Sequence, residues 1–284
     1  MKAAVGKTPC ALAIGGLDPG GGAGIAADLR AFAAAGVFGA AALAVVTVQS
    51  TAGLRSVRAL AAREVVAQAA AVLRHQRVRA VKVGALGSEA NVRAVARLLG
   101  RHPGVAVVVD TPMLPTRGRA RLLSERAVAA LRDELLPRAT LVTVNAGEAH
   151  ALVGERVRTV GEAHDAARAL VQAGARAALV KGGHVDAAGP SAIDVLAIAG
   201  EVVELRARRL AVGAVHGTGC TLASLIAGRL ACFGATEGAR VGRTEGARVD
   251  AEGLVAAIRW AKRVHHAALA RAVDVGGGMR VMMP

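Results

Sequence analysis

The stretch ALAIGGLDPGGGAGIAADLRAFAAA, residues 11–35, joins an apolar run to a helical pattern through a glycine-rich turn. Its first four residues, 11–14, predict a buried strand, and residues 25–35 predict a helix. The glycines between them allow a ligand or a neighbouring strand to approach the backbone, and the start of the helix favours negative charge. Because the glycines do not follow the G-x-G-x-x-G spacing, this turn is not a dinucleotide-binding fingerprint.

The alternation of strands and helices continues along the chain. Residues 191–198 and 201–205 predict a hairpin that turns at Ala199-Gly200. Strands that alternate with helices are typical of the α/β class, in which a mostly parallel sheet is covered by helices on both faces. Ligands then bind beyond the carboxyl ends of the strands, so residues that directly follow a strand are candidate site residues. Further strands are predicted over residues 41–48, 80–83, 105–109, 141–144 and 177–180, and helices over residues 63–75, 88–99, 124–136, 147–153, 161–173, 218–231 and 252–272.

The composition supports one large domain. The chain has 284 residues, of which 54% are apolar and 20% are charged, so it can bury a substantial core. We expect a single domain over residues 1–284. The sequence TEGARV at residues 236–241 recurs at residues 244–249, and we interpret residues 234–250 as a duplicated surface insertion between the last two helices.

The formal net charge of +15 raises the question of nucleic-acid binding. However, the arginines are scattered over helical stretches, and aromatic residues, which would stack on bases, make up only 1% of the chain. We therefore expect no nucleic-acid partner. A basic surface would still favour the approach of anionic nucleotides.

The cellular compartment can also be predicted. Three cysteines without C-x-x-C spacing suit a reducing cytosol, and the apolar run at residues 11–14 is too short for a signal peptide. Residues 31–54 carry no charge, but glycines and polar residues interrupt them, which favours a helix end, a turn and a strand over a membrane span. We expect a cytoplasmic protein with no membrane partner.

Two polar residues near predicted strand ends are candidates for binding a small molecule. Asp28 lies in the helix that follows the glycine-rich turn, and Gln49 ends the strand at residues 41–48. The amide of Gln49 offers both a donor and an acceptor, which suits the edge of a heterocycle. The alternatives are a surface carboxylate in a first helical turn for Asp28 and a turn-forming side chain for Gln49.

Two further strand ends carry candidates for binding phosphate. Asn145 and Glu148 follow the strand at residues 141–144, and a carboxylate there could hold Mg²⁺ against the phosphates of a nucleotide. The alternative is an ordinary capping box at a helix start. Lys181 follows the strand at residues 177–180 and could reach a phosphate, or it could be a cationic loop residue.

The run His216-Gly217-Thr218-Gly219-Cys220-Thr221 is the strongest local signal. Its two glycines expose backbone amides at a helix start, which predicts an anion hole for a migrating phosphoryl group. The pKa of a thiol at such a position tends to fall, so Cys220 could orient a substrate hydroxyl or accept its proton. The alternative is a small buried residue in a glycine-rich cap.

Taken in order, these segments resemble the hydroxymethylpyrimidine/phosphomethylpyrimidine kinases of thiamine biosynthesis, within the ribokinase-like superfamily. The resemblance implies a ribokinase-like three-layer α/β/α sandwich with a central, mostly parallel sheet. The resemblance covers residues 11–231 and resumes in the last helix. The matching segments are Gly16-Leu17-Asp18-Pro19 through Asp28, Thr47 to Thr51, Lys82-Val83-Gly84, Val109-Asp110, Asn145 to Glu148, Val180 to His184, Asp194-Val195 and His216 to Cys220.

The resemblance also implies roles on the acceptor side. Gln49 would read the pyrimidine, and Gly16 and Asp28 would line the substrate pocket. The run Gly217-Thr218-Gly219-Cys220 would form the catalytic anion hole. Most ribokinase-like sugar kinases place an Asp as base where this chain has Cys220, which favours the pyrimidine and pyridoxal branch.

On the donor side, the resemblance implies ATP and Mg²⁺ as cofactors. Asn145, Glu148 and Lys181 would bind the nucleotide, and Glu148 and Asp110 are the expected metal ligands. We also expect a homo-oligomer, with a dimer favoured.

The chain departs from the family pattern on the acceptor side. Ala85 stands where the family usually has a Met that covers the pyrimidine. The usual Asp-Pro-Val-Met is here Asp110-Thr111-Pro112-Met113, and Thr116 replaces a nearby Lys. These changes bear on the identity of the acceptor more than on the phosphoryl chemistry.

The resemblance therefore implies ATP-dependent phosphorylation of 4-amino-5-hydroxymethyl-2-methylpyrimidine, of its monophosphate, or of both. A pyridoxal or pyridoxine kinase is the first alternative, because pyridoxal is another heterocycle with a hydroxymethyl group. The second alternative is a non-catalytic, basic nucleic-acid-binding or regulatory protein on a kinase fold.

Overall fold

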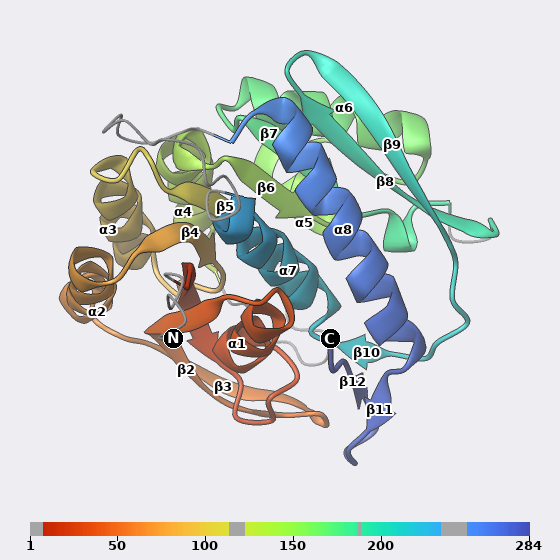
Figure 1. Ribbon diagram of the computed structural model, residues 1–284. Helices are drawn as coiled ribbons and strands as arrows, with labels where there is room; N and C mark the ends of the chain where they lie inside the picture. Colours follow the sequence, from red (N-terminus) through yellow and green to blue (C-terminus); the bar gives the residue numbers. More distant parts are fainter. Residues whose placement is uncertain (1–7, 114–122, 187–188, 234–248) are drawn as a thin grey trace, which may run out of the picture.

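The computed structural model describes residues 8–113, 123–186, 189–233 and 249–284 (Figure 1). Its main sheet contains β1 (Cys10–Leu17), β2 (Phe38–Ser50), β3 (Gly53–Ala59), β4 (Val78–Val83), β5 (Ala106–Asp110), β6 (Leu141–Val144), β7 (Ala177–Val180), β8 (Ser191–Ile198) and β9 (Glu201–Arg208). Within the described residues, these nine strands lie in the order β3-β2-β1-β4-β5-β6-β7-β8-β9. The six central strands, β2-β1-β4-β5-β6-β7, run parallel to one another. Strand β3 pairs antiparallel with β2, β8 with β7, and β9 with β8.

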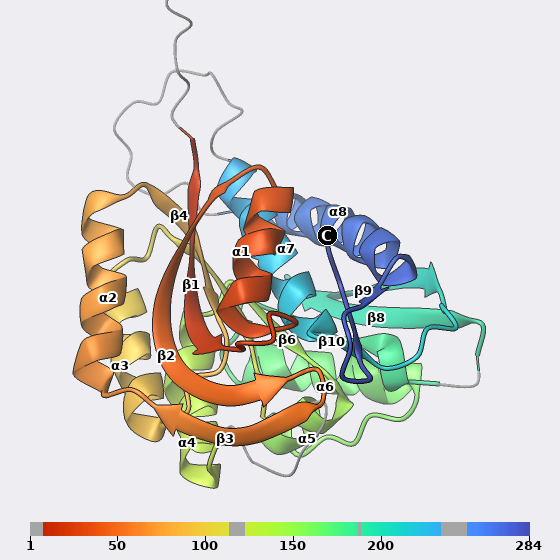
Figure 2. The same ribbon diagram turned by 90° about the horizontal axis from the view of Figure 1, so that it is seen from below.

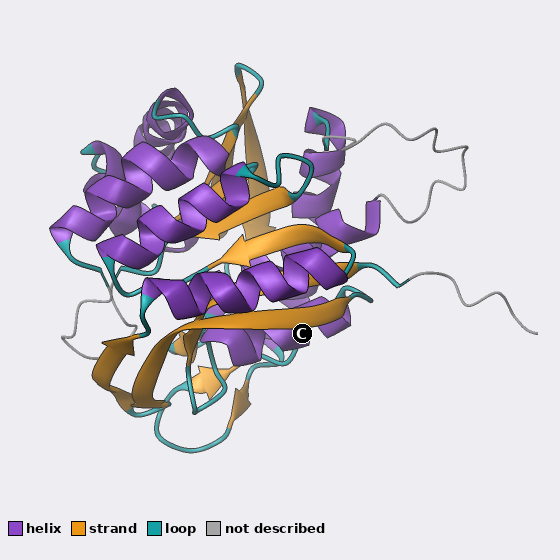
Figure 3. Ribbon diagram, turned by 90° about the vertical axis from the view of Figure 1, so that its left-hand side faces the viewer, coloured by secondary structure: helices purple, strands orange, loops and turns teal. Residues whose placement is uncertain are grey.

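Side chains of the strands alternate between two cores, one on each face of the sheet. In β1, Leu12 and Ile14 point into one core, and Ala11 and Ala13 into the other. Helices cover both faces, which gives the three-layer α/β/α sandwich expected from the sequence (Figure 3). The first face is covered by α2 (Ala62–His75), α3 (Glu89–Gly100), α4 (Glu125–Ala130), α5 (Ala146–Val153) and α6 (Val160–Gln172), and the second by α1 (Gly24–Ala34), α7 (Thr218–Phe233) and α8 (Ala251–Ala270).

Helix α7 lies between α1, α8 and the sheet, and it is buried along most of its length (Figure 1). The strand residues beneath it are small, among them Ala13 and Ala80, so the helix packs close to the sheet. A Cβ added at Gly228 would lie only 2.7 Å from the Cβ of Ala35, the C-cap of α1. This close packing holds the start of α7 in a fixed position, beside the carboxyl ends of the strands.

Most helix and strand predictions agree with the structure, and two N-caps were predicted correctly. The Ser88 hydroxyl accepts a hydrogen bond from the amide of Asn91, and the Ser124 hydroxyl accepts one from Ala127. The helix predicted over residues 124–136 is α4 followed by a π-helical turn, Leu131–Leu135, and a 3₁₀ turn, Leu136–Arg138. The predicted hairpin turns at Ala199 and Gly200, both with positive φ (52° and 84°).

Four strands were not predicted. Strand β3 forms an edge hairpin with β2, and the two form a long curved ribbon at one side of the sheet (Figure 2). A small second sheet combines β10 (Val215–His216), β12 (Arg280–Val281) and β11 (Val273–Asp274). It links the segment before α7 to the C-terminal segment.

Two predictions fall on residues that the structure does not describe. The duplicated insertion predicted over residues 234–250 lies outside the described residues except for its last two, of which Asp250 accepts a hydrogen bond from the amide of Gly253 and caps α8. Thr116 also lies outside them. Among the helices that are described, none is both long enough and apolar enough to span a bilayer.

Candidate active site

A cavity of about 740 Å³ opens where the carboxyl ends of the parallel strands meet the start of α7. This is the position where α/β sheets usually bind ligands. Eleven of the predicted site residues line it: Gly16, Gln49, Ala85, Asp110, Asn145, Glu148, Lys181, Gly217, Thr218, Gly219 and Cys220. Segments more than 200 residues apart in the sequence therefore share one cavity, as the sequence predicted.

The glycine-rich turn after β1 packs directly against the segment that precedes α7. Gly24 has a φ of +57°, and a Cβ there would lie 2.2 Å from the carbonyl oxygen of Gly16. Gly217 has a φ of +78°, and a Cβ there would lie 1.9 Å from the carbonyl oxygen of Gly22. Gly24 thus closes the turn onto β1, and the contact of Gly217 with Gly22 brings the two segments together backbone to backbone, which only glycine permits at these positions.

A buried hydrogen-bond network links this turn to Gln49. The Nε2 atom of His216 lies 2.8 Å from Oδ2 of Asp18 and 3.0 Å from Nε2 of Gln49. Asp18 also accepts hydrogen bonds from the amides of Gly20 and Ala23, each at 2.9 Å. Burial is the largest single effect and raises the pKa of Asp18, but His216 and the amides of Ala23 and Gly20 together outweigh it, and the net pKa is lowered. The ionised Asp18 accepts the hydrogen of His216 Nε2 and anchors the imidazole, against which the side-chain amide of Gln49 lies at the cavity wall.

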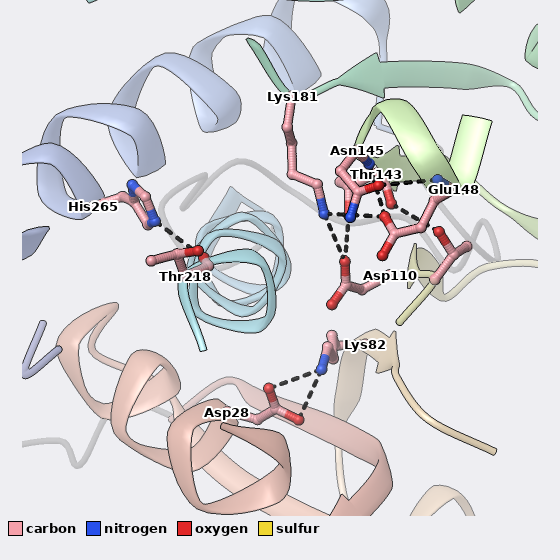
Figure 4. Close-up of polar contacts among 10 residues, drawn as sticks. Asp28, Lys82, Asp110, Thr143, Asn145, Glu148, Lys181, Thr218 and His265 are labelled. Atoms are coloured by element: carbon pink, nitrogen blue, oxygen red, sulfur yellow. Dashed lines mark hydrogen bonds and ion pairs between the residues drawn. The ribbon is translucent and has the colours of Figure 1, made fainter. Parts of the chain in front are cut away.

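Asp28 does not line the cavity, contrary to the sequence prediction. Its carboxylate accepts hydrogen bonds from Nζ of Lys82 at 2.9 and 3.0 Å and from Oγ of Ser224 at 2.7 Å. Helix α1 turns Asp28 inward, toward β4 and α7, and Lys82 is the residue of this pair that reaches the cavity (Figure 4). Burial alone would lower the pKa of Lys82, but the charge of Asp28 raises it, so the ammonium stays protonated.

The predicted donor-side residues form a second charged group. Nζ of Lys181 lies 3.2 Å from Oδ1 of Asp110 and 3.6 Å from Oε2 of Glu148 (Figure 4). The Thr143 hydroxyl donates to Asp110 at 3.1 Å. The capping-box alternative is also present, because Asn145 and Glu148 exchange hydrogen bonds between side chain and backbone at 2.7 and 2.9 Å. The capping box fixes the Glu148 carboxylate beside Lys181.

These charges bear on whether a metal could bind. Burial favours the protonated form of Asp110, but the positive charges of Lys181 and Lys82 outweigh burial, so the pKa of Asp110 is lowered. For Glu148 burial prevails, and its pKa is raised. Among the described residues, no cluster of three or more His, Cys, Asp or Glu side chains could hold a metal by itself. Mg²⁺ needs only one or two carboxylates when water and substrate phosphates complete its shell, so Asp110 and Glu148 fit this cation.

The start of α7 presents free backbone amides to the cavity. The amide of Thr221 donates to the carbonyl of Gly217 at 3.0 Å, so the amides of Thr218, Gly219 and Cys220 precede the first intrahelical hydrogen bond. A Cβ at Gly219 would lie 3.1 Å from Nζ of Lys181. The amides and the ammonium group therefore face one small volume that suits an anion.

The prediction of a lowered thiol pKa at the helix start is wrong. Burial raises the pKa of Cys220 to about 12; Lys82 opposes this rise, and the nearby carboxylates of Asp110 and Asp28 add to it. At neutral pH, Cys220 is therefore a neutral hydrogen-bonding group rather than a thiolate.

Helix α8 supplies a wall of the cavity that the sequence analysis did not single out. Lys262 and His265, three residues apart on this helix, both line the cavity. Other polar residues that line the cavity and were missed include Lys82, Asp18 and His216. A lone lysine in the apolar strand β4 was a usable signal for Lys82, whereas nothing in the local sequence of α8 marks its wall residues.

Comparisons with known proteins agree with this geometry. A family described as phosphomethylpyrimidine kinase matches residues 18–240. A hydroxymethylpyrimidine/phosphomethylpyrimidine kinase of Rhizobium meliloti is 43% identical over 227 residues, which cover 79% of this chain and 83% of that protein.

Solved structures with the same fold include a phosphomethylpyrimidine kinase from Clostridium difficile, with 28% identity and a TM-score of 0.72 over 92% of this chain and 99% of that one. An ADP complex of pyridoxal kinase from Bacillus subtilis has 27% identity and a TM-score of 0.81 over 97% of both chains.

Proposed function

The chain belongs to the phosphomethylpyrimidine kinase family, and on this basis we propose that it transfers the γ-phosphoryl group of ATP to 4-amino-5-hydroxymethyl-2-methylpyrimidine, to its monophosphate, or to both. The reaction belongs to thiamine biosynthesis. The observation that carries this proposal is the shared cavity, into which the start of α7, Gln49 and Lys181 all open.

The pyrimidine binds at the end of the cavity formed by Gly16, Gln49 and Ala85. The side-chain amide of Gln49 pairs with the polar edge of the ring, and it lies against the imidazole of His216, which Asp18 anchors. This arrangement directs the hydroxymethyl group toward Cys220. In a second reaction, a phosphate oxygen of the monophosphate is the attacking group, and the product is a diphosphate.

ATP binds at the opposite end, where Lys181 and Asn145 lie beside the triphosphate. Glu148 and Asp110 would hold Mg²⁺, which, when bound, neutralises charge on the triphosphate. Lys181 already lies between these two carboxylates, so its ammonium is oriented before the nucleotide arrives. Burial alone would lower the pKa of Lys181, but the negative charges of Asp110 and Glu148 outweigh this effect. The pKa of Lys181 is therefore raised, and the ammonium keeps its charge.

The phosphoryl group moves between the two ends, past the start of α7. Its equatorial oxygens accept hydrogen bonds from the amides of residues 218–220, which stabilise the charge of the transition state. The thiol of Cys220 orients the attacking hydroxyl by a hydrogen bond. Phosphoryl transfer is largely dissociative, so the hydroxyl needs little deprotonation before it attacks and a neutral thiol suffices. The new O–P bond forms as the bond from the γ-phosphorus to ADP breaks, and the hydroxyl proton passes to an oxygen of the transferred phosphoryl group.

A turnover assay tests this function directly. The purified protein is incubated with ATP, Mg²⁺ and one acceptor at a time: the pyrimidine, its monophosphate or pyridoxal. We expect one or both pyrimidines to be phosphorylated with the highest kcat/KM. No ATP consumption, together with salt-dependent binding to duplex DNA, would instead favour a non-catalytic basic protein.

Pyridoxal phosphorylation is the second candidate function. The structural likeness to a pyridoxal kinase supports it, and so does the small side chain of Ala85 in the wall of the acceptor end. A higher kcat/KM for pyridoxal than for either pyrimidine in the same assay would establish this candidate in place of the first.

A further inference from the structure

His265 in helix α8 contacts the first turn of α7. Its Nε2 atom lies 3.0 Å from the carbonyl oxygen of Thr218 (Figure 4). A carbonyl oxygen can only accept a hydrogen bond, so Nε2 must carry the hydrogen. The imidazole stays neutral, because burial lowers the pKa of His265 to about 4.

The accepting carbonyl belongs to the peptide unit that also carries the amide of Gly219. The structure contains no cis peptide among the described residues, and in a trans unit the carbonyl and the amide point in opposite directions. The hydrogen bond from His265 therefore fixes this unit from behind, while the Gly219 amide points toward the cavity. The unit lies in the first turn of α7, where helical hydrogen bonding is least complete, and the glycine at 219 adds little steric restraint, so the contact from His265 adds to what holds it.

Helix α8 is itself fixed beside the phosphate-binding residues. Nζ of Lys262, one turn before His265, bonds to the carboxylate of Asp194 and donates to the carbonyl of Leu205 at 3.0 Å. The same carboxylate accepts a hydrogen bond at 2.7 Å from the amide of Gly182, the residue after Lys181. The imidazole is thus presented from a helix that is tied to the Lys181 segment.

We propose that His265 is a positioning residue for phosphoryl transfer, which locks the Thr218–Gly219 peptide so that the Gly219 amide faces the migrating phosphoryl group. This proposal rests on the proposed kinase function. His265 touches neither substrate in this role and acts only through the backbone of α7. Its effect should therefore appear in the stabilisation of the transition state more than in the binding of ADP or acceptor.

The test compares two substitutions with opposite expectations. His265→Leu removes the donor, whereas His265→Gln keeps an amide donor near the position of Nε2. We expect His265→Leu to lower kcat by about 10-fold to 10²-fold, as a small misplacement of a catalytic group does, with the KM of the acceptor changed less than about twofold. His265→Gln should recover most of kcat. Arg263→Leu, at an exposed position of the same helix, is the matched control and should behave like the unchanged protein.

A binding measurement separates this proposal from the proposed function. The affinities for ADP alone and for ADP with aluminium fluoride, a mimic of the migrating phosphoryl group, are measured by calorimetry without any acceptor. We expect His265→Leu to keep the ADP affinity and to lose about 10-fold or more of the gain from aluminium fluoride. The unchanged protein could fail to phosphorylate any pyrimidine and still gain more affinity from aluminium fluoride than His265→Leu does. In that case the proposed acceptor is wrong, and His265 keeps its role.

Equal kcat and equal aluminium fluoride gain in His265→Leu and the unchanged protein would overturn the proposal. So would an equal loss in the Leu and Gln variants. Should His265→Leu fail to fold, His265→Asn replaces it, because its shorter amide cannot reach the Thr218 carbonyl. It should then show the same losses.

Discussion

Nζ of Lys82 lies 2.9 Å from Oδ1 of Asp28, and only 1% and 0% of the two side chains are exposed. Replacing Lys82 by Met would leave a buried carboxylate with no counter-charge. We expect Lys82→Met to lower the free energy of unfolding by about 3–5 kcal/mol, the usual effect of removing one partner of a buried ion pair. Urea denaturation at pH 7 measures this loss.

The matched control for Lys82→Met is Arg93→Met. Arg93 pairs with Glu89 and Glu134 on the surface, where its side chain is 47% exposed. Surface ion pairs contribute at most about 1 kcal/mol, so this variant should stay close to the unchanged protein. A loss at Lys82 no larger than that at Arg93 would contradict the buried pair.

Cys220 offers a prediction about the chemistry. Cys220→Ala removes the group that orients the hydroxyl and should lower kcat by about 10² or more. Cys220→Ser keeps a hydrogen-bonding group and should retain more activity than the Ala variant. Burial raises the pKa of the Cys220 thiol to about 12, so the thiol does not titrate between pH 6 and 9. The pH–rate profile of Cys220→Ser should therefore have the same shape over this range as that of the unchanged protein. Near-normal turnover of Cys220→Ala would remove Cys220 from the mechanism.

The network of Asp18 and His216 predicts a pH-dependent stability. The folded-state pKa of Asp18 is lowered, so its contribution is present above the unfolded-state pKa and is lost as pH falls through the folded-state value. Asp18→Asn should cost about 1–3 kcal/mol at pH 7, the range for a hydrogen bond to a charged group, and progressively less below about pH 4. Urea titrations at several pH values measure the difference in unfolding free energy; a difference that does not change with pH would exclude a lowered pKa of Asp18.

Ala85 predicts the selectivity for the acceptor. A Cβ at Gly16 would lie 3.6 Å from the Cβ of Ala85, so these two small residues leave the ring space on one side. Ala85→Met should fill this space and raise the KM for pyridoxal by about 10-fold, since overfilling a pocket costs about 1–3 kcal/mol. The KM for the pyrimidine should change less. Equal KM changes for both acceptors would place Ala85 outside the acceptor site.

The sequence predicted the architecture because its main signals are local. Short apolar strands, the serine caps of α3 and α4, and the Ala199-Gly200 turn each depend on neighbouring residues. Strand β3 was missed because its sequence, GLRSVRA, is polar at an exposed edge. The strands of the small sheet are only two residues long, and their pairing joins distant segments.

For the candidate site as well, features set by the local sequence were predicted, and features set by contacts between distant elements were missed. Residues that follow strands, such as Gln49 and Lys181, were predicted from position alone. The burial of Asp28 and the raised pKa of Cys220 depend on side chains from other elements, which no local pattern reveals. The predicted dimer stays a prediction.

The central claim is that the amides of residues 218–220 bind the migrating phosphoryl group while Cys220 orients the attacking hydroxyl. A crystal structure with ADP, aluminium fluoride and the hydroxymethylpyrimidine tests this most directly. We expect the fluoride ligands within about 3 Å of the Gly219 and Cys220 amides, and the hydroxymethyl oxygen in contact with Sγ of Cys220. Fluoride ligands held away from the start of α7, or a hydroxymethyl group turned away from Cys220, would contradict it.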